Sequence, residues 1–598
     1  MRFALRRHVR GFRVLIAFGF RAAPREATLF LLAGAAMALL GPVGSFAAKV
    51  LIDGVVAHDL AHTLFASVIS AAVAALALLN GMYYIDWFFA VLEKASAAIN
   101  RALMGLLGGT PGIAHHELPQ YLQELELLQE RRHSLAGMTN ATVGMVRIAV
   151  QLVASGVLLA RLDPVLLALP LVGIGSFLAG RKAQRLKQVA EEACVATERQ
   201  RRHLYEVATS ASLGKEVRLF GLRDELLRRH HRAAGTVMTI RNRADWQSAG
   251  FEALGTLLFG LAYAGSVALV LVRAVDGLAT PGDVVLAIGL VAGLNNVVSM
   301  AVGYGTFFLG VLRVADRYLW LLDYAAANQA SPAEPAPVPD RLDRGIDLSD
   351  LTFRYPGSAA TVLQQVSLHL PAGGVVALVG ENGAGKTTLA KVLCRFYEPD
   401  GGQILVDGID LRRLPVDAWR ARLSAAFQDF ARFEFLVRET VGVGDLPRIE
   451  QSAVISEALA RAGAGDVLAT LPERLETQLG KAWKGGVEFS GGQWQKLALG
   501  RAMLREQPLL VIFDEPTAAL DAPTEHALFE RFAAAARGSQ LAGTVTVLVS
   551  HRFSTVRMAD LIVVLEHGQV VEQGSHADLM ARNGTYAALY RLQSQAYQ

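Results

Sequence analysis

Residues 375–394, VVALVGENGAGKTTLAKVLC, indicate the fold of the C-terminal half of the chain. Its first five residues are apolar and rich in valine, as in a buried strand, and KTTLAKVL has the composition of a helix. Between them, residues 380–387 match the phosphate-binding loop and stand where that loop must stand, after a strand and before a helix. Apolar runs alternate with helical patterns from about residue 346 onward, which predicts an α/β domain with a largely parallel sheet.

We expect this loop to bind phosphate groups. Its glycines let backbone N–H groups turn toward phosphate oxygens, the helix N-terminus adds its dipole, and Lys386 supplies a positive charge. The hydroxyl of Thr387 is placed to bind Mg²⁺. The alternative, a glycine-rich turn that binds nothing, is disfavoured by the motifs downstream. The nucleotide-binding residues predicted in this run are Gly380, Glu381, Asn382, Gly383, Ala384, Gly385, Lys386, Thr387 and Thr388.

Two further motifs follow the loop. LLVIFDEP, residues 509–516, is an apolar strand that ends in Asp514 and Glu515. The first acid is placed to hold Mg²⁺ and the second to orient or deprotonate an attacking water. Upstream, Ser490 and the two glycines after it open a helix whose N–H groups are exposed to an anion.

Taken in order, these motifs resemble the ATP-binding cassette (ABC) transporters. The resemblance covers residues 347–598 through the phosphate loop, Gln428 in AAFQDF, the SGGQ sequence, the Asp-Glu pair, Asp521 in AALD and His551 in VSHR. Apolar spans with long basic connections precede this cassette, so nearly the whole chain is similar to an exporter-type half-transporter. The cofactors that this resemblance implies are ATP and Mg²⁺.

The resemblance also implies roles for particular residues. Tyr355 would stack on adenine, and Gln428 would lie near Mg²⁺ and the attacking water. His551 would contact the γ-phosphate and hold Glu515, the proposed base. The predicted catalytic residues are Glu515, His551 and Gln428, and the predicted Mg²⁺ ligands are Thr387, Gln428 and Asp514.

A second cassette completes each site in this family. The signature residues would bind the γ-phosphate of a nucleotide held by the opposite cassette, so that a dimer encloses two ATP. A homodimer is favoured over a heterodimer because the chain keeps Lys386, Gln428, Ser490, Glu515 and His551, whereas heterodimeric relatives often carry one site with its base or signature replaced. The remaining nucleotide-binding residues are Tyr355, Ser490, Gly491, Gly492, Gln493 and Asp521. Phe489 and Gln478 depart from the residues usual in the family; we expect activity despite Phe489, and Gln478 bears on coupling to the membrane part.

The composition of the whole chain excludes several classes of protein. Its 598 residues are 52% hydrophobic and 19% charged, against about 45–50% and about 25% in ordinary soluble domains. This excludes a disordered or collagen-like chain and gives no sign of a nucleic-acid partner. The two cysteines are too few for a disulfide framework.

Six apolar runs are long enough for membrane helices, which cross about 30 Å of hydrocarbon. Residues 1–26 and 181–245 are rich in Lys and Arg, whereas the connections near 52–62 and 274–281 contain none. By the positive-inside rule, both termini and the long connections are cytoplasmic, in the cell inner (cytoplasmic) membrane. The runs lie near 28–52, 63–90, 138–161, 164–181, 251–272 and 282–311.

These patterns predict a membrane all-α domain of six helices with long cytoplasmic extensions, followed by an α/β P-loop NTPase domain. A basic start with a short apolar run could be a signal peptide, but an interfacial amphipathic helix is favoured. The predicted domains are an interfacial helix at 1–26, the transmembrane domain at 27–323, a linker at 324–346 and the cassette at 347–598.

The function that follows is an ATP-driven exporter of a peptide, drug-like or lipid-like substrate. The alternatives are a lipid flippase and a non-transporting membrane sensor ATPase. The expected partners are a second copy of the chain, membrane lipid and an unidentified substrate. Two segments, residues 112–122 and 213–222, are candidates for contacting the cassettes; the adjacent histidines of the first are expected to be solvated rather than to bind metal. Within the spans, Asp86 and Arg147 are predicted to pair or to share a cavity position.

Overall fold

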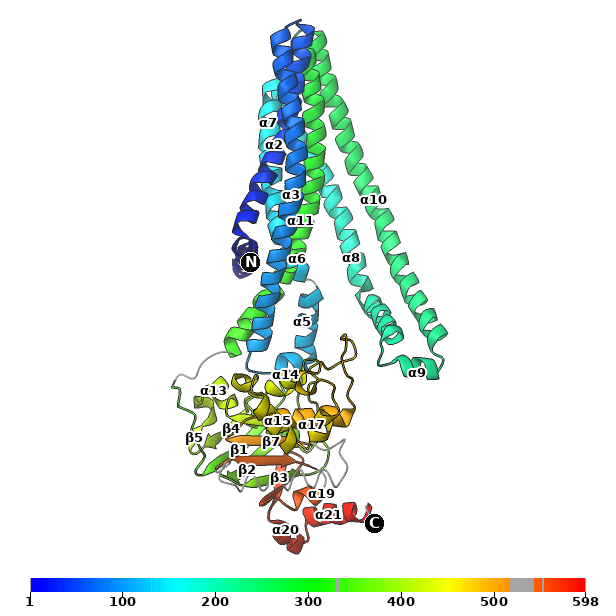
Figure 1. The fold of residues 1–598 in the computed structure, drawn as a ribbon. Helices are drawn as coiled ribbons and strands as arrows, with labels where there is room; N and C mark the ends of the chain where they lie inside the picture. The colour runs from blue at the N-terminus through cyan, green and yellow to red at the C-terminus, as the bar shows by residue number, and fades with distance from the viewer. Residues whose placement is uncertain (1, 131, 329–333, 516–542, 551–552, 597–598) are drawn as a thin grey trace. The chain divides into compact units, whose positions relative to one another are not determined.

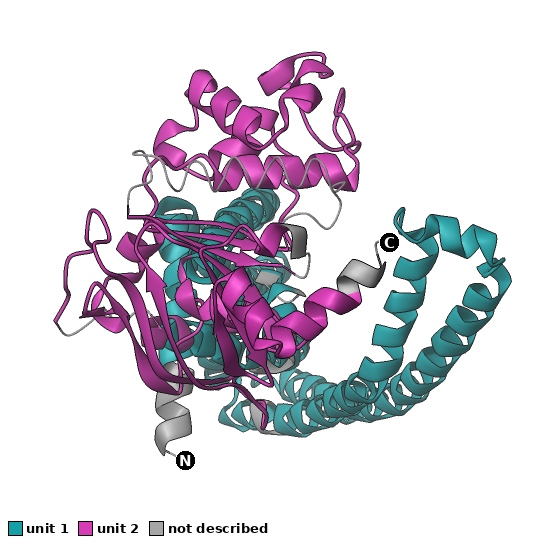
Figure 2. Cartoon of the chain, turned by 90° about the horizontal axis from the view of Figure 1, so that it is seen from below, with its two compact units in different colours: residues 1–108, 124–323 teal, residues 109–123, 324–598 magenta. Residues whose placement is uncertain are grey.

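The computed structural model describes residues 2–130, 132–328, 334–515, 543–550 and 553–596. It divides into two compact units (Figure 2). The first contains residues 1–108 and 124–323, and the second contains residues 109–123 and 324–598. Residues 109–123, which lie between two of the apolar helices in sequence, therefore belong to the same unit as the C-terminal half.

The first unit is built from long helices, six of which are long and apolar enough to cross a membrane. This confirms the predicted fold class of the N-terminal half. Several of these helices are longer than a membrane is thick. Helix α3 has 50 residues, which gives a length of about 75 Å at 1.5 Å per residue, whereas the hydrocarbon core of a bilayer is about 30 Å thick. The helices are α1 (Arg2–Ala22), α2 (Pro24–Val56), α3 (Leu60–Gly109), α5 (Pro119–Glu130), α6 (Arg132–Ala136), α7 (Met138–Leu162), η1 (Pro164–Ala168), α8 (Leu169–Thr209), α9 (Gly214–Leu219), α10 (Arg223–Val275) and α11 (Pro281–Asn328).

Helices α8 and α10 run side by side as an antiparallel hairpin with α9 at its tip (Figure 1). Ion pairs cross between them in their polar parts: Lys187 to Glu252 at 3.2 Å and Arg241 to Glu191 at 3.0 Å. Helix α9 lies within the predicted contact segment 213–222. Its contact with a cassette stays a prediction.

The N-terminal helix α1 packs against other helices of its unit. Leu15 is 1% exposed, and Phe12 and Phe18 meet Phe308 and Tyr318 edge to face, with ring centroids 5.5 and 5.7 Å apart. One face of α1 is therefore covered by protein. An interfacial position for its other face stays a prediction.

The connection between α10 and α11, predicted to lie outside the cell, is fastened to the end of α2. The Asp53 carboxylate accepts hydrogen bonds from the Gly282 N–H and the Thr280 hydroxyl, both at 2.9 Å. One turn earlier, Lys49 forms an ion pair with Asp283, which is 9% exposed. These contacts hold the C-terminal end of α2 against the N-terminal end of α11.

Replacing Lys49 by methionine is expected to lower the thermal stability of the protein. Removing one partner of a mostly buried ion pair leaves the Asp283 carboxylate without its cation, which costs about 3–5 kcal/mol in well-buried cases. The measurement is the midpoint of thermal unfolding in detergent. The control is Lys94→Met, which removes the lysine of a more exposed pair with Glu26. An equal fall of the unfolding midpoint in both variants would show that the Lys49–Asp283 pair has no special stabilising role.

The predicted pairing of Asp86 with Arg147 is wrong. Asp86 is exposed, and the described residues include no ion pair between the two. Arg147 instead lies beside the hydroxyl of Tyr84, which neighbours Tyr304. Two residues further along a helix is about 200° further around it at 3.6 residues per turn. Asp86 therefore points away from the face of α3 that Tyr84 presents to Arg147.

The second unit contains two sheets. The larger has the strand order β10-β9-β3-β8-β7-β6, in which β9, β3, β8, β7 and β6 are parallel and β10 is antiparallel to β9. The smaller sheet is antiparallel, in the order β2-β1-β4-β5. The strands are β1 (Gly345–Arg354), β2 (Thr361–Pro371), β3 (Val375–Val379), β4 (Gly401–Val406), β5 (Ile409–Asp410), β6 (Leu423–Ala426), β7 (Leu510–Asp514), β8 (Val545–Val549), β9 (Leu561–Glu566) and β10 (Gln569–Gly574).

The central strands are fully buried, as their unbroken apolar sequences predict. All five residues of β3, β7 and β8 are buried, which is the pattern of a parallel sheet covered on both faces. The helices of this unit are α4 (Ala114–Glu117), α12 (Lys386–Leu393), α13 (Val416–Arg420), α14 (Val437–Gly442), α15 (Ser452–Arg461), α16 (Gly465–Ala469), α17 (Gly491–Ala502), α19 (Phe553–Val556), α20 (His576–Arg582) and α21 (Thr585–Ala596).

Candidate nucleotide-binding site

The candidate site lies at the edge where the parallel strands of the larger sheet end. The loop at 380–385 follows β3, Glu515 follows β7, and Gln428 lies two residues beyond the last residue of β6. Because parallel strands place their carboxyl ends at one edge, the motifs that are far apart in sequence converge here. The register fixes this: Leu378 of β3 pairs with Val549 of β8, which pairs with Asp514 of β7.

Two glycines in the loop cannot be replaced without strain. Gly380 has φ +148°, and a Cβ there would lie 2.1 Å from the carbonyl oxygen of Leu565. Gly385, just before α12, has φ +101°, and a Cβ there would lie 2.9 Å from the side chain of Leu363. The loop therefore turns tightly against β9 and β2 and leads directly into the N-terminus of α12.

Lys386 lies at the start of α12 and is 7% exposed. Its Nζ donates to the carbonyl oxygens of Gly380 and Glu381 at 2.8 and 2.9 Å, so the side chain folds back across the loop. Burial lowers the pKa of Lys386, and the nearby carboxylates of Glu515 and Asp514 oppose that fall. The amine is held where a phosphate group on the loop would meet it.

Thr387 and Asp514 form the candidate Mg²⁺ site. The Thr387 hydroxyl donates to Oδ1 of Asp514 at 3.2 Å, and Asp514 is 2% exposed. Burial raises the pKa of Asp514, and the Thr387 hydrogen bond opposes that rise. Mg²⁺ takes oxygen ligands in an octahedron at 2.0–2.1 Å, so adjacent ligands stand about 2.9 Å apart. The two oxygens suit such an ion in chemistry and spacing.

The backbone at Glu515 is in an unusual conformation. Its φ is +48°, and its N–H donates to the carbonyl of Val549 at 2.9 Å. A non-glycine residue in this region carries strain that concentrates at functional sites. Gln428 is exposed beside this edge, and the acid after it, Asp429, contributes to the raised pKa of Asp514. Sequence reasoning missed Asp429, although it adjoins a residue that was selected.

Tyr355, predicted to stack on adenine, is half-buried next to α12. Its hydroxyl lies 3.0 Å from the Thr388 hydroxyl, and its ring meets the rings of Phe353 and Tyr397 at 5.1 and 5.2 Å. Both ring contacts are edge-to-face. The structure thus brings Tyr355 to the loop, and its role toward adenine stays a prediction.

The SGGQ sequence opens α17, as predicted. The Ser490 hydroxyl accepts from the Gln493 N–H at 3.3 Å, and the Gln493 side chain accepts from the Ser490 N–H at 2.9 Å. This capping box fixes the first turn. Ser490 and Gly491 are exposed, so the end of the helix is open to a partner.

The two departures from the family pattern are both explained by local packing. Phe489 is 6% exposed and meets Trp494 edge to face at 5.8 Å, so it fills the core beneath the signature. The Gln478 side chain donates to the carbonyl of Glu434 at 2.8 Å. Gln478 therefore ties two loops of the second unit to each other. Two predicted residues, Asp521 and His551, lie outside the described residues.

Residues 109–123 contact the C-terminal half directly, which is the contact predicted for the segment at 112–122. The carboxylate of Glu117 accepts from Lys391 Nζ at 2.6 Å and from the Tyr397 hydroxyl at 2.5 Å. Arg420 donates to the carbonyl of Pro111, also at 2.5 Å. His115 is 1% exposed, which corrects the expectation that it is solvated. Among the described residues there is no metal-ligand cluster.

Residues 363–518 match the sequence model of the ABC transporter family. The chain is 40% identical over 255 residues to an "ATP-dependent lipid A-core flippase" of Aromatoleum aromaticum, covering 42% of this chain and 41% of that protein. A flippase of the same name from Xylella fastidiosa is 32% identical over 396 residues, covering 63% and 62%. The matches thus span from about two fifths to three fifths of those relatives' length.

The fold of the whole chain also matches a solved structure. "Structure of a bacterial Atm1-family ABC exporter with ATP bound" superposes with a TM-score of 0.77 over 96% of this chain and 98% of that one, at 24% sequence identity. This likeness establishes the fold. The family match makes residues 363–518 an ABC transporter (ATP-binding) domain, and the other unit contains the six helices that are long and apolar enough to cross a membrane.

Proposed function

We propose that this chain is an ATP-driven exporter. The proposal starts from two findings: the chain contains an ABC transporter domain, and its fold is that of an ABC exporter. The observation that carries the proposal is the convergence of Lys386, Thr387, Asp514 and Glu515 at one sheet edge, in a chain whose other unit has six apolar helices. ATP binding would close two such domains, and hydrolysis would reopen them. The membrane helices would then alternate between inward and outward access.

Each residue at this edge has a task in the proposed reaction. The loop N–H groups and Lys386 hold the phosphates, and Thr387, Asp514 and Gln428 would hold Mg²⁺. Bound Mg²⁺ would supply neutralisation of phosphate charge. Glu515 accepts the proton of the attacking water as general base, His551 holds Glu515 and the γ-phosphate, and Tyr355 stacks on adenine.

The working unit in this proposal is a homodimer. Ser490 and Gly492 of one chain would bind the γ-phosphate of ATP held by the other chain. In this arrangement the exposed N-terminus of α17 binds that phosphate. No predicted site residue is replaced in the sequence, so one chain is able to supply both halves of both sites. The chain would lie in the cytoplasmic membrane with both termini in the cytoplasm, because residues 1–26 and 181–245 are basic.

A lipid flippase is the second candidate. The relatives that match this chain carry the name lipid A-core flippase, and one match extends well beyond the ATP-binding domain. A lipid-like cargo is consistent with the exporter fold. A sensor ATPase would hydrolyse ATP without moving any compound.

The test is ATP hydrolysis by the full chain in lipid vesicles, with peptides, lipids and amphipathic drugs as a panel. Glu515→Gln is expected to lower the Mg-ATPase rate at least about hundredfold, the scale of general-base catalysis, while ATP still binds. Glu473→Gln, an exposed acid of the same unit, is the control. A Glu515-independent rate contradicts the proposed base, and hydrolysis without movement of any compound favours the sensor.

A further inference from the structure

Gln428 lies in a loop that contains neither helix nor strand, residues 427–435, which we call the Gln428 loop. Before the loop, Ala426 is fixed in the larger sheet by its pairing with Phe513 of β7. After the loop, the chain enters α14. Gln428 itself is exposed, so the position of its side chain depends on what holds the loop.

Arg501 holds the Gln428 loop from the last turn of α17. Its guanidinium donates to the carbonyl of Ala431 at 3.2 Å and lies over the ring of Phe433, with Cζ 4.6 Å from the ring centroid. Its Nε donates to the carbonyl of Thr440 in α14 at 3.0 Å, and the Thr440 hydroxyl donates to the carbonyl of Phe433 at 2.9 Å. One side chain therefore joins α17, α14 and the Gln428 loop.

The charge of Arg501 is held without a carboxylate. Among the described residues Arg501 forms no ion pair, and its partners are two carbonyl oxygens and the face of an aromatic ring. Burial lowers the pKa of Arg501 to about 10, so the guanidinium is still charged at neutral pH. Filling this space would require only an apolar side chain, which avoids the cost of desolvating a cation. Packing alone therefore does not account for an arginine here.

The short distances along the chain make this contact a restraint on Gln428. Gln428 lies two residues after Ala426 and three residues before Ala431, and a chain spans at most about 3.3–3.6 Å per residue. Because Ala426 pairs with Phe513, the chain leaves the sheet beside the end of β7, where Glu515 follows. Holding Ala431 on Arg501 therefore keeps the main chain of Gln428 close to that end of β7.

We propose that Arg501 is a positioning residue for ATP hydrolysis, which holds the Gln428 loop so that the Gln428 side chain reaches the Mg²⁺ and the attacking water. Arg501 acts through Ala431 and Phe433 and does not touch the nucleotide. The planar guanidinium donates two directed hydrogen bonds and stacks on a ring at the same time, which the ammonium group of lysine cannot do. This inference rests on the proposed function, because it concerns the reaction at that site.

The first measurement is trypsin cleavage after Arg432, an exposed residue of the Gln428 loop, in the full chain in detergent without nucleotide. Arg501→Lys keeps the charge and is expected to speed this cleavage at least about fivefold, because the loop opens more easily. The control is Arg505→Lys, the same change at an arginine that donates to the carbonyls of Gly444 and Leu423 at 3.1 and 2.6 Å. An equal rate of cleavage in the two variants would overturn the proposal.

The second measurement asks whether Arg501 acts through Gln428. Arg501→Lys is expected to lower kcat of the Mg-ATPase about tenfold, as expected for a misplaced group, and to leave KM for ATP within about twofold. In a Gln428→Ala chain, the same change is expected to lower kcat by less than about twofold, because the effects of coupled residues are not additive. A loss of equal size in both backgrounds, or a rise in KM alone, would overturn the proposal.

A milder variant keeps the proposal testable if Arg501→Lys fails to fold. Phe433→Leu removes the ring under the guanidinium and keeps the backbone carbonyls that Arg501 binds, so smaller changes in the same direction are expected in both measurements. No change in either measurement would overturn the proposal. Comparing ATP hydrolysis of the wild type with Glu515→Gln on the same preparation tests the proposed function separately, because the trypsin measurement needs no ATP.

Discussion

Replacing Lys386 by methionine is expected to abolish ATP hydrolysis while leaving the protein folded. Among the described residues, Lys386 Nζ is bonded within its own loop, to the carbonyls of Gly380 and Glu381. Methionine keeps most of the side-chain volume at this 7% exposed position, so packing changes little. The lost cation weakens phosphate binding, since a hydrogen bond to a charged group contributes about 1.5–3 kcal/mol.

The measurement is ATP affinity and Mg-ATPase rate of the Lys386→Met protein in vesicles. An affinity loss of about tenfold or more follows from that energy, and the rate falls further because the charge also acts on the transition state. Lys484→Met, which removes an exposed lysine of the same unit, is the control. Hydrolysis at the wild-type rate in Lys386→Met would show that the phosphates bind elsewhere.

The nucleotide site was predictable because its signals are local. The glycines, Lys386 and Thr387 lie in one run of sequence, and the fixed order of a strand, a loop and a helix places them. Asp514 was predictable for the same reason, since it ends a fully apolar strand. The parallel sheet then brings these ends together without further information from the sequence.

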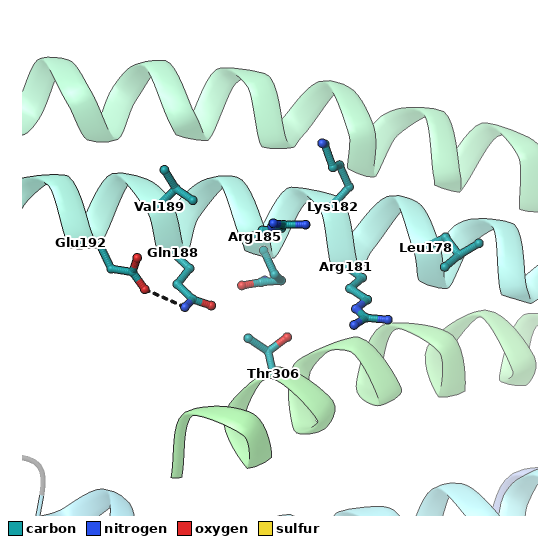
Figure 3. A pocket seen from close by; sticks show the side chains of 9 residues that line it. Leu178, Arg181, Lys182, Arg185, Gln188, Val189, Glu192 and Thr306 are labelled. Carbon is teal, nitrogen blue, oxygen red and sulfur yellow. Dashed lines mark hydrogen bonds between the residues drawn. The ribbon is translucent and has the colours of Figure 1, made fainter. Parts of the chain in front are cut away.

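Contacts that depend on the direction of a side chain were not predictable. Asp86 and Arg147 lie on spans that are consecutive in sequence, but the position of Asp86 around α3 turns it away from Arg147. The basic run of α8 was visible in the sequence, whereas only the structure shows that Arg181 and Arg185 border a pocket with Thr306 of α11 (Figure 3). Glu117 and Tyr397 are 280 residues apart, so no local pattern could have joined them.

Removing the Glu117 carboxylate is expected to uncouple ATP hydrolysis from transport. Glu117 belongs to the segment 109–123, which is continuous in sequence with α3 and α5, and it holds Lys391 and Tyr397 of the ATP-binding domain. Burial lowers the pKa of Lys391, but the bond and charge of Glu117 outweigh this and raise it. Burial and the bond to Glu117 together raise the pKa of Tyr397. The two donors are therefore held in their hydrogen-bonding forms.

The contact between Glu117 and Tyr397 is linked to the candidate nucleotide site through the ring of Tyr355. Tyr397 meets Tyr355 at 5.2 Å, and the Tyr355 hydroxyl lies 3.0 Å from Thr388 in α12. A cavity of about 740 Å³ borders these rings and the segment. A ligand that stacks on Tyr355 would contact a ring that packs on Tyr397, whose hydroxyl is bonded to Glu117. Glu117 acts here as a positioning residue through Tyr397, without touching the nucleotide.

Glu117→Ala is therefore expected to keep the basal ATPase rate within about twofold while losing stimulation by a transported compound, because the contact contributes roughly 1.5–3 kcal/mol but no catalytic group. Tyr397→Phe, which removes only the hydroxyl, should show part of the same loss. The double variant completes a double-mutant cycle on the free energy of unfolding. The coupling energy between Glu117 and Tyr397 is expected to be about 1–2 kcal/mol. Glu126→Ala, an exposed acid of α5, is the control. Full stimulation in Glu117→Ala, or strictly additive effects of the two changes, would mean that the contact only holds the segment in place.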